Sequence, residues 1–299
     1  MATVNILGVP HTYELTPPVS QMDRPVLVFI HGWLLSRHYW RPLVEKLSPD
    51  YQCLLYDLRG FGESQGESPN PRNYSLQAYG EDLGTLLETL KIKRAWLMGH
   101  SLGGSIALWA AQSYPDFIEG VICLNAGGGI YLKEEFERFR AAGQQIVKRR
   151  PKWLCCIPFL DLVFCRAMVA QTLPRIWGRQ RLLDFVNASY QAALGSLLES
   201  TTESEVHLLP QVVARLSQPV YFLAGEEDMV MELKYVNHLA SFHPLFEMTG
   251  ANVMQIANCG HLSMVEQTEA VYDQIRGILD KYTILSSVSL PSNTEKRGW

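Results

Sequence analysis

The pentapeptide Gly-His-Ser-Leu-Gly at positions 99–103, taken with its neighbours, constrains the fold more than any other feature of the chain. An apolar run, residues 95–98, precedes it, and a helix-like stretch, residues 104–113, follows it. A serine hydroxyl is a weak nucleophile unless a sharp strand-to-helix turn lifts it clear of a sheet, within reach of a base. The segment therefore predicts a strand, a tight turn that carries Ser101, and a helix.

Short apolar runs alternate with amphipathic segments of helical length through most of the chain. We predict strands at residues 26–30, 53–56, 95–98, 120–124, 220–223 and 253–256, and an antiparallel edge hairpin at residues 8–15. We predict helices at residues 39–47, 75–90, 104–113, 232–241 and 265–282, the second capped by Ser75. This alternation predicts an α/β fold with a mostly parallel central sheet flanked by helices.

The regular alternation breaks between residues 127 and 209, where the pattern turns helical and contains Pro151, Pro158 and Pro174. We interpret residues 128–209 as an inserted helical cap between two parts of a core, residues 1–127 and 210–285. The last segment, residues 286–299, loses periodicity and is expected to be disordered.

A nucleophilic serine needs a base, and His261 is the best candidate among the eight histidines. It follows the strand predicted at 253–256 and a turn-forming Asn-Cys-Gly, and the chain order serine, acid, histidine suits this kind of fold. The acid that orients the histidine is expected after the preceding strand, where Asp228 has the right spacing and Glu226 and Glu227 are alternatives.

The oxyanion of a tetrahedral intermediate needs two donors, and backbone amides suit this role because little is lost in pre-organising them. Leu102, directly after the serine, is expected to supply one amide. The second is expected from Trp33, which follows the strand predicted at 26–30.

Composition narrows the class of protein further. The chain has 299 residues, a net charge of −4 and 47% hydrophobic residues, so it is expected to be globular and not to bind nucleic acid. We find no signal peptide, no transmembrane segment and no metal-ligand spacing, and six scattered cysteines are expected to be buried, reduced thiols. We therefore expect a cytoplasmic protein without metal or cofactor.

Several motifs together resemble the α/β-hydrolase family. They are His-Gly-Trp at 31–33, Asp-Leu-Arg-Gly-Phe-Gly-Glu-Ser at 57–64, the serine turn at 99–104, Gly-Glu-Glu-Asp at 225–228 and Gly-His at 260–261. The resemblance implies the α/β-hydrolase fold, a Ser101, Asp228 and His261 triad, and a structural role for the 57–64 block. Epoxide hydrolases and haloalkane dehalogenases use an aspartate at the turn, so Ser101 argues against both.

The cap contains the most apolar stretch of the chain, residues 153–170, interrupted by Asp161 and Arg166. Residues 131–185 contain eleven Lys or Arg and five Asp or Glu, a net charge of +6. Either the apolar side packs on the core, or it contacts an anionic membrane. Both interpretations favour a large apolar ester as substrate, bound near Trp153, Phe159 and Phe164.

The cap and late core are also similar to the chlorophyll dephytylase branch of the family. The similar segments are residues 125–128, 133–136, 139–145, 177–181 and 207–213. This resemblance implies removal of phytol from chlorophyll at a thylakoid surface. Alternatives remain open: a generic carboxylesterase or lipase, a hydrolase of carbon-carbon bonds or thioesters, or a non-catalytic ligand receptor on the same fold.

Overall fold

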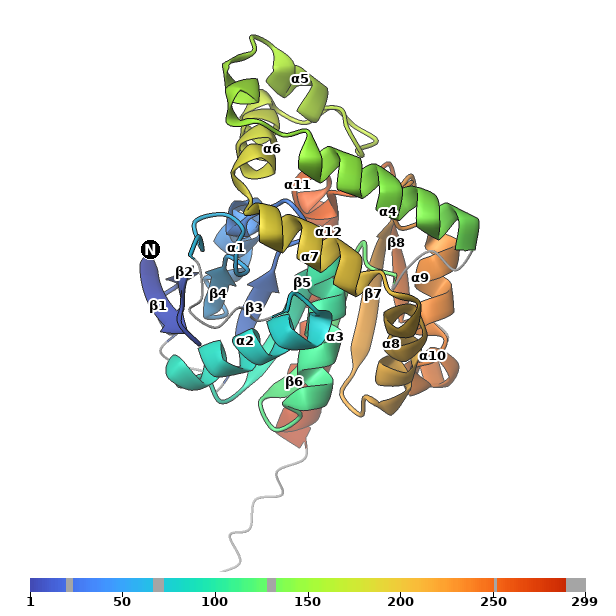
Figure 1. Ribbon diagram of the computed structural model, residues 1–299. Coiled ribbons are helices and arrows are strands. Elements are labelled where there is room, and N and C mark those ends of the chain that lie inside the picture. Colours follow the sequence, from blue (N-terminus) through green and yellow to red (C-terminus); the bar gives the residue numbers. More distant parts are fainter. Residues whose placement is uncertain (20–23, 67–72, 128–132, 250–251, 289–299) are drawn as a thin grey trace, which may run out of the picture.

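The apolar runs pair into one eight-stranded sheet in the computed structural model, which describes residues 1–19, 24–66, 73–127, 133–249 and 252–288 (Figure 1). The strand order is β1-β2-β4-β3-β5-β6-β7-β8, and every pair from β4 to β8 is parallel. The strands are β1 (Ala2–Ile6), β2 (Val9–Leu15), β3 (Val26–Ile30), β4 (Cys53–Tyr56), β5 (Ala95–His100), β6 (Ile118–Leu124), β7 (Val220–Gly225) and β8 (Val253–Ile256). The predicted mostly parallel α/β sheet is confirmed.

The hairpin at the sheet edge differs from its prediction. Residues 9–15 form the single strand β2, which pairs antiparallel with β1 on one side and with β4 on the other, so the hairpin of β1 and β2 spans residues 2–15 and not 8–15. Its turn residues Leu7 and Gly8 have φ of 51° and 88°, and two consecutive positive φ values match the twist of a tight hairpin. The Asn5 side chain accepts a hydrogen bond from the Gly8 amide at 2.9 Å, so the turn lies at the start of the predicted segment and not within it.

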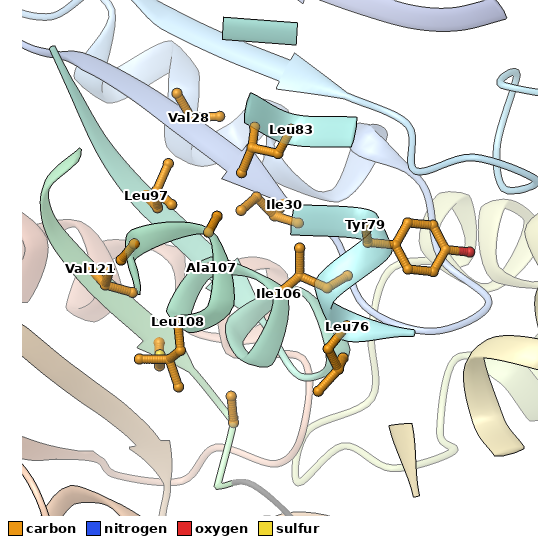
Figure 2. Packing of buried hydrophobic residues seen from close by; sticks show 14 of the residues in the cluster. Val28, Ile30, Leu76, Tyr79, Leu83, Leu97, Ile106, Ala107, Leu108 and Val121 are labelled. Atoms are coloured by element: carbon orange, nitrogen blue, oxygen red, sulfur yellow. The ribbon is translucent and has the colours of Figure 1, made fainter. Parts of the chain in front are cut away.

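Helices cover both faces of the sheet, and strand residues alternate between two buried clusters. Val28 and Ile30 of β3 pack in one cluster with α2 (Leu76–Thr89) and α3 (Leu102–Ser113). Leu27 and Phe29 pack in the other, with α1 (Arg41–Leu47) and α12 (Thr268–Val288). Because both faces are buried, apolar residues occupy successive positions, which is why these strands lack polar alternation. Figure 2 shows the first cluster around α2 and α3.

The remaining helices of the core lie close to their predicted positions. The predicted segment 39–47 begins as a 3₁₀ turn, η1 (Arg37–Trp40), before α1, and the predicted segment 265–282 divides into α11 (Ser263–Glu266) and α12. Helix α9 (Leu233–Ala240) matches the predicted segment 232–241, whereas α10 (Pro244–Thr249) was not predicted. Ser75 caps α2 as expected, because its side chain accepts from the Ala78 amide at 3.1 Å.

Between β6 and β7 all elements of the described residues are helices, joined by turns and irregular segments. The elements are α4 (Lys133–Lys148), η2 (Lys152–Cys156), α5 (Leu160–Phe164), α6 (Arg175–Asn187), α7 (Tyr190–Ser200) and α8 (Glu203–Arg215). In Figure 1, α5 and α6 project away from the sheet at the top of the molecule. The predicted boundary at 209/210 falls inside α8, whose Leu209, Val212 and Val213 pack in the core.

The end of the chain also differs in part from its prediction. Helix α12 runs to Val288, three residues into the 286–299 segment expected to be disordered, because the next proline is Pro291 and nothing earlier interrupts the helix. Residues 289–299 lie outside the described part. Within the described ranges, no helix has the length and apolar character needed to cross a membrane.

Candidate active site

The four loops that carry the predicted site follow the carboxyl ends of β3, β5, β7 and β8. The sheet order changes direction at β3, which has β4 on one side and β5 on the other. In open parallel sheets, the crevice beyond the carboxyl ends at such a switch point is the usual place for a ligand. The topology therefore brings together loops that are distant in sequence.

Ser101 sits in a strained turn between β5 and α3. Its φ of 51° and ψ of −118° lie in a region that residues with side chains rarely adopt, at a cost of about 1–3 kcal/mol. A Cβ at Gly99 would lie 2.3 Å from the Gly103 carbonyl oxygen, and a Cβ at Gly103 would lie 2.3 Å from that of Ile30. The two flanking glycines are therefore required by close backbone approach, as the pentapeptide predicts.

His261 and Asp228 form a hydrogen-bonded pair. His261 Nδ1 lies 2.8 Å from Asp228 Oδ2, and both side chains are buried. Asp228 Oδ1 accepts from the amides of Val230 and Met231 at 2.8 and 3.0 Å. A carboxylate can only accept here, so Nδ1 carries the proton and Nε2 is left as the basic nitrogen.

The environment keeps Asp228 ionised. Burial alone would raise its pKa, but hydrogen bonds from His261, Met231 and Asn125, together with the charge of His261, lower the pKa to about 2. The alternative acids Glu226 and Glu227 are exposed, so the structure pairs His261 with Asp228.

Asn125 is a fourth member of this group that the sequence analysis gave no role. It follows β6, and its Nδ2 donates to Asp228 Oδ2 at 2.9 Å and to the Gly260 carbonyl at 3.0 Å. Its φ of 49° is one that asparagine tolerates better than most residues. The only available signal was its place directly after the strand between β5 and β7, where a polar side chain reaches the same crevice.

The backbone of His261 is held on both sides. His100 Nε2 donates to the His261 carbonyl at 2.7 Å, and the two ring centroids are 4.9 Å apart. Burial lowers the pKa of His100 to about 3, so it acts as a neutral donor. The His261 amide donates to the carbonyl of Met168, in the cap, at 2.8 Å. Because His100 adjoins Ser101 in sequence, these contacts place His261 next to the serine turn.

Glu266 connects the histidine loop to the cap. Its Oε1 accepts from the Gly260 amide at 2.6 Å and from the cap amide of Ala170 at 2.9 Å. No sequence pattern indicated this role, because the acid lies five residues after His261 and contacts only backbone. The contact couples the position of the cap to the loop that carries His261.

The two predicted oxyanion donors lie in loops that approach Ser101. Leu102 is the first residue of α3, so its amide lacks an acceptor within the helix. The loop of Trp33 approaches Ser101 closely, since a Cβ at the preceding Gly32 would lie 3.2 Å from Ser101 Cβ. Trp33 Nε1 donates to the Ala193 carbonyl of α7 at 2.9 Å. Their use as oxyanion donors stays a prediction.

The three cap residues expected near the substrate have different surroundings. Trp153 and Phe159 are 62% and 66% exposed, and the Phe164 ring packs at a tilt of 54° against Phe185, with centroids 5.5 Å apart. A hollow of about 330 Å³ in the cap is lined by Phe159, Arg175, Arg179 and neighbours, and none of the predicted catalytic residues lines it. Their part in binding substrate stays a prediction.

The 57–64 block has the structural role that the resemblance implies. Asp57 is fully buried and accepts from the Arg37 amide at 2.7 Å and the Glu63 amide at 2.9 Å. It also pairs with the Arg37 guanidinium. The block thus ties its loop to the start of η1, beside the crevice.

The chain is similar in sequence to known proteins. Residues 25–157 match a family model described as alpha/beta hydrolase fold. The chain is 26% identical over 262 residues to an uncharacterized hydrolase, YugF, of Bacillus subtilis, covering 84% of this chain and 89% of that protein. It is 25% identical over 274 residues to 3-oxoadipate enol-lactonase 2 of Acinetobacter baylyi, covering 88% and 91%.

Among solved structures, the chain is similar to a thermophilic esterase from Thermogutta terrifontis with malate bound. The TM-score is 0.74 and the identity 23%, over 94% of this chain and 99% of that chain. The likeness at this identity concerns the fold.

Proposed function

We propose that this chain, a hydrolase of the α/β-hydrolase fold, cleaves carboxylic esters with Ser101 as nucleophile, His261 as general base and Asp228 as the acid that orients it. His261 Nε2 takes the hydroxyl proton as Ser101 Oγ attacks the ester carbonyl. The Leu102 and Trp33 amides stabilise the oxyanion. His261 then gives its proton to the departing alcohol, and water, activated by His261, releases the acid from the acyl-enzyme.

One observation carries the proposal: a buried histidine, hydrogen-bonded to an ionised aspartate, contacts His100, the residue directly before a serine in a strained turn. Strain of this kind persists only where the surrounding structure enforces it, and it is concentrated at functional sites. The names of two similar proteins, a lactonase and an esterase, agree with ester chemistry.

The cap supports the substrate class that we propose. Its apolar character favours an ester with a large apolar group, and its resemblance to chlorophyll dephytylases makes the phytyl ester of chlorophyll the specific substrate we propose. On that proposal, the products are phytol and chlorophyllide, formed where the pigment is held in thylakoid membranes.

The test compares wild type, Ser101→Ala and Ser105→Ala, the last as a control one helical turn along α3. Each is assayed with p-nitrophenyl esters of increasing chain length, with an acyl thioester, and with detergent-solubilised chlorophyll. We expect Ser101→Ala to lose about 10⁴-fold or more in kcat and Ser105→Ala to remain active. Full activity of Ser101→Ala contradicts the mechanism.

The assays with different substrates distinguish the more specific proposals. Chlorophyllide formed by wild type supports the dephytylase proposal, whereas turnover of simple esters alone supports a general carboxylesterase. Preferential cleavage of the thioester assigns a different leaving group to the same triad. Absent turnover with strong ligand-induced stabilisation would indicate a receptor instead.

A further inference from the structure

The cap projects an apolar surface into solvent. Half of the exposed large hydrophobic side chains that the structure describes lie between residues 153 and 183, about a tenth of the chain. Ile176, Phe159, Trp153 and Val163 are each more than 60% exposed. We call residues 148–183 the cap apex. Monomeric soluble proteins rarely expose so many large hydrophobic side chains in one region unless that region binds a partner.

These side chains are exposed because the apex has a small core of its own. Asp161 at the start of α5 is buried and forms ion pairs with Arg175 and Arg179 of α6, and Cys165 is buried between the same helices. These buried contacts hold α5 against α6. The neighbouring η2 has no buried residue. Of the two interpretations of the apolar stretch, packing on the core does not account for these side chains.

Cations surround the apolar side chains. The apex contains eight Lys or Arg and one Asp, a formal net charge of +7 in a chain whose total is −4. Lys148, Arg149, Lys152 and Arg166 are exposed, as are the two partners of Asp161, while Asp161 itself is buried. The solvent-facing side of the apex therefore has cations and apolar groups without an exposed acid.

Apolar and cationic groups also meet locally. The Arg175 guanidinium lies 5.6 Å from the centroid of the Phe159 ring, and both residues line the hollow of about 330 Å³. Phe159 has a φ of 63°, a backbone conformation that few aromatic residues adopt. The apex thus holds an aromatic ring outward beside guanidinium groups.

We propose that the cap apex docks on a lipid bilayer that contains anionic lipid. Trp153, Phe159 and Val163 enter the boundary between headgroups and acyl chains, and the exposed Lys and Arg side chains bind lipid phosphates. A second copy of the chain is disfavoured as the occupant, since two apices of charge +7 repel each other. Docking places the cap at the membrane, where apolar esters reside. Because Glu266 and Met168 connect the cap to the loop that carries His261, that loop is brought close to the membrane too.

Co-sedimentation with vesicles tests the proposal independently of activity. The vesicles are phosphatidylcholine alone, or phosphatidylcholine with about one third phosphatidylglycerol. We expect wild type to bind the anionic vesicles, and to be released when salt is raised from about 0.05 to about 0.5 M. Failure to bind anionic vesicles, or equal binding to both compositions at both salt concentrations, overturns the proposal.

Two sets of variants locate the surface. Trp153→Ser/Phe159→Ser/Val163→Ser and, separately, Lys152→Gln/Arg166→Gln are each expected to weaken vesicle binding about tenfold or more, the second with a smaller salt dependence. The matched control is Leu208→Ser/Met229→Ser, which removes exposed apolar side chains elsewhere and is expected to bind as wild type. Thermal unfolding confirms that each variant is folded. Unchanged binding of the apex variants overturns the assignment.

Two adjacent thiols offer a direct reporter. Cys155 and Cys156 are exposed at the apex, contrary to the expectation of buried thiols, whereas the other four cysteines are buried. In Cys156→Ser, a polarity-sensitive dye on Cys155 is expected to brighten and shift to the blue with anionic vesicles only. Binding to polyglutamate without any response to vesicles would identify an acidic protein surface as the partner and overturn the proposal.

Discussion

The core crevice, where the loops that carry Ser101, Asn125, Asp228 and His261 meet, differs from the cap apex in how its functional side chains are held. In the crevice, the acid and the histidine have fixed partners: Asp228 accepts four hydrogen bonds, and His261 is held through its ring, its amide and its carbonyl. At the apex, apolar and cationic side chains face solvent and only their supporting residues, such as Asp161, are buried.

This difference separates two kinds of function. A group that must act on a bond at a defined distance has to be positioned before the substrate arrives, so its neighbours hold it. A surface that adapts to a fluid partner needs only the right mixture of apolar and charged groups. Changes in the crevice should therefore alter turnover of every substrate, whereas changes at the apex should alter membrane binding.

The largest effect is expected at the base. His261→Ala removes the proposed acceptor of the serine proton and should lower kcat for a soluble p-nitrophenyl ester by about 10⁴-fold or more. His207→Ala, an exposed histidine on α8, is the control and should be active. Comparable losses in both variants would remove the distinction between the crevice and the rest of the molecule.

The next effect concerns the junction between the two regions. Asp184, in α6 of the cap, accepts from Ser36 of the core at 2.8 Å and from Gln180 at 3.0 Å. Burial raises the pKa of Asp184 from 3.8 to about 7. The folded state therefore keeps a proton that the unfolded chain releases above about pH 4, so this group lowers stability as the pH rises toward 7, with little further change above it.

In Asp184→Asn the side chain is an amide, which does not ionise between pH 4 and pH 8. Its free energy of unfolding, relative to wild type, should increase by up to about 4 kcal/mol between pH 4 and pH 8 in urea titrations. The exposed Asp116→Asn serves as the matched control. Parallel curves for Asp184→Asn and wild type would show that this junction does not titrate.

A smaller effect is expected when a positioning contact is removed. Asn125→Gly deletes the hydrogen bonds to Asp228 and Gly260 and tolerates the positive φ. Loss of a buried hydrogen bond costs about 1–3 kcal/mol, so kcat should fall about 10- to 100-fold while KM changes little. Steady-state kinetics across pH check this, and an unchanged kcat contradicts a positioning role.

The smallest effect tests the connection to the cap. Glu266→Gln keeps an acceptor for the Gly260 and Ala170 amides and should be close to wild type, whereas Glu266→Ala removes it and should lower kcat about fivefold. Kinetics of the pair with a soluble ester provide the comparison. Equal activity of the two variants would show that the connection does not affect the histidine loop.

The strained turn at Ser101 and the hydrogen bond between His261 and Asp228 have requirements that are visible locally in the sequence. The serine turn needs glycines at fixed positions, and the base and acid follow buried strands whose apolar runs are visible in the chain. The predicted α/β-hydrolase fold is confirmed by the sheet topology and the comparisons. Asn125 and Glu266 were missed because their roles depend on contacts across 103 and 96 positions with no local pattern.

The cap was harder to predict for a physical reason. An apolar run has the same composition whether it packs inward or faces outward, and only the buried Asp161 with its two arginines reveals that this apex has its own support. The predicted bounds of the edge hairpin were wrong for a similar reason, because the turn at Leu7 and Gly8 lacks a strong turn sequence and depends on the Asn5 side chain.

The central claim is that Ser101 is the nucleophile of a prearranged triad. The most direct measurement is intact-protein and peptide mass spectrometry after reaction with an alkyl fluorophosphonate. The account predicts one adduct on the peptide that contains Ser101, its absence in Ser101→Ala, and much slower labelling in His261→Ala. An adduct on another serine, or equal labelling of Ser101 without His261, would contradict it.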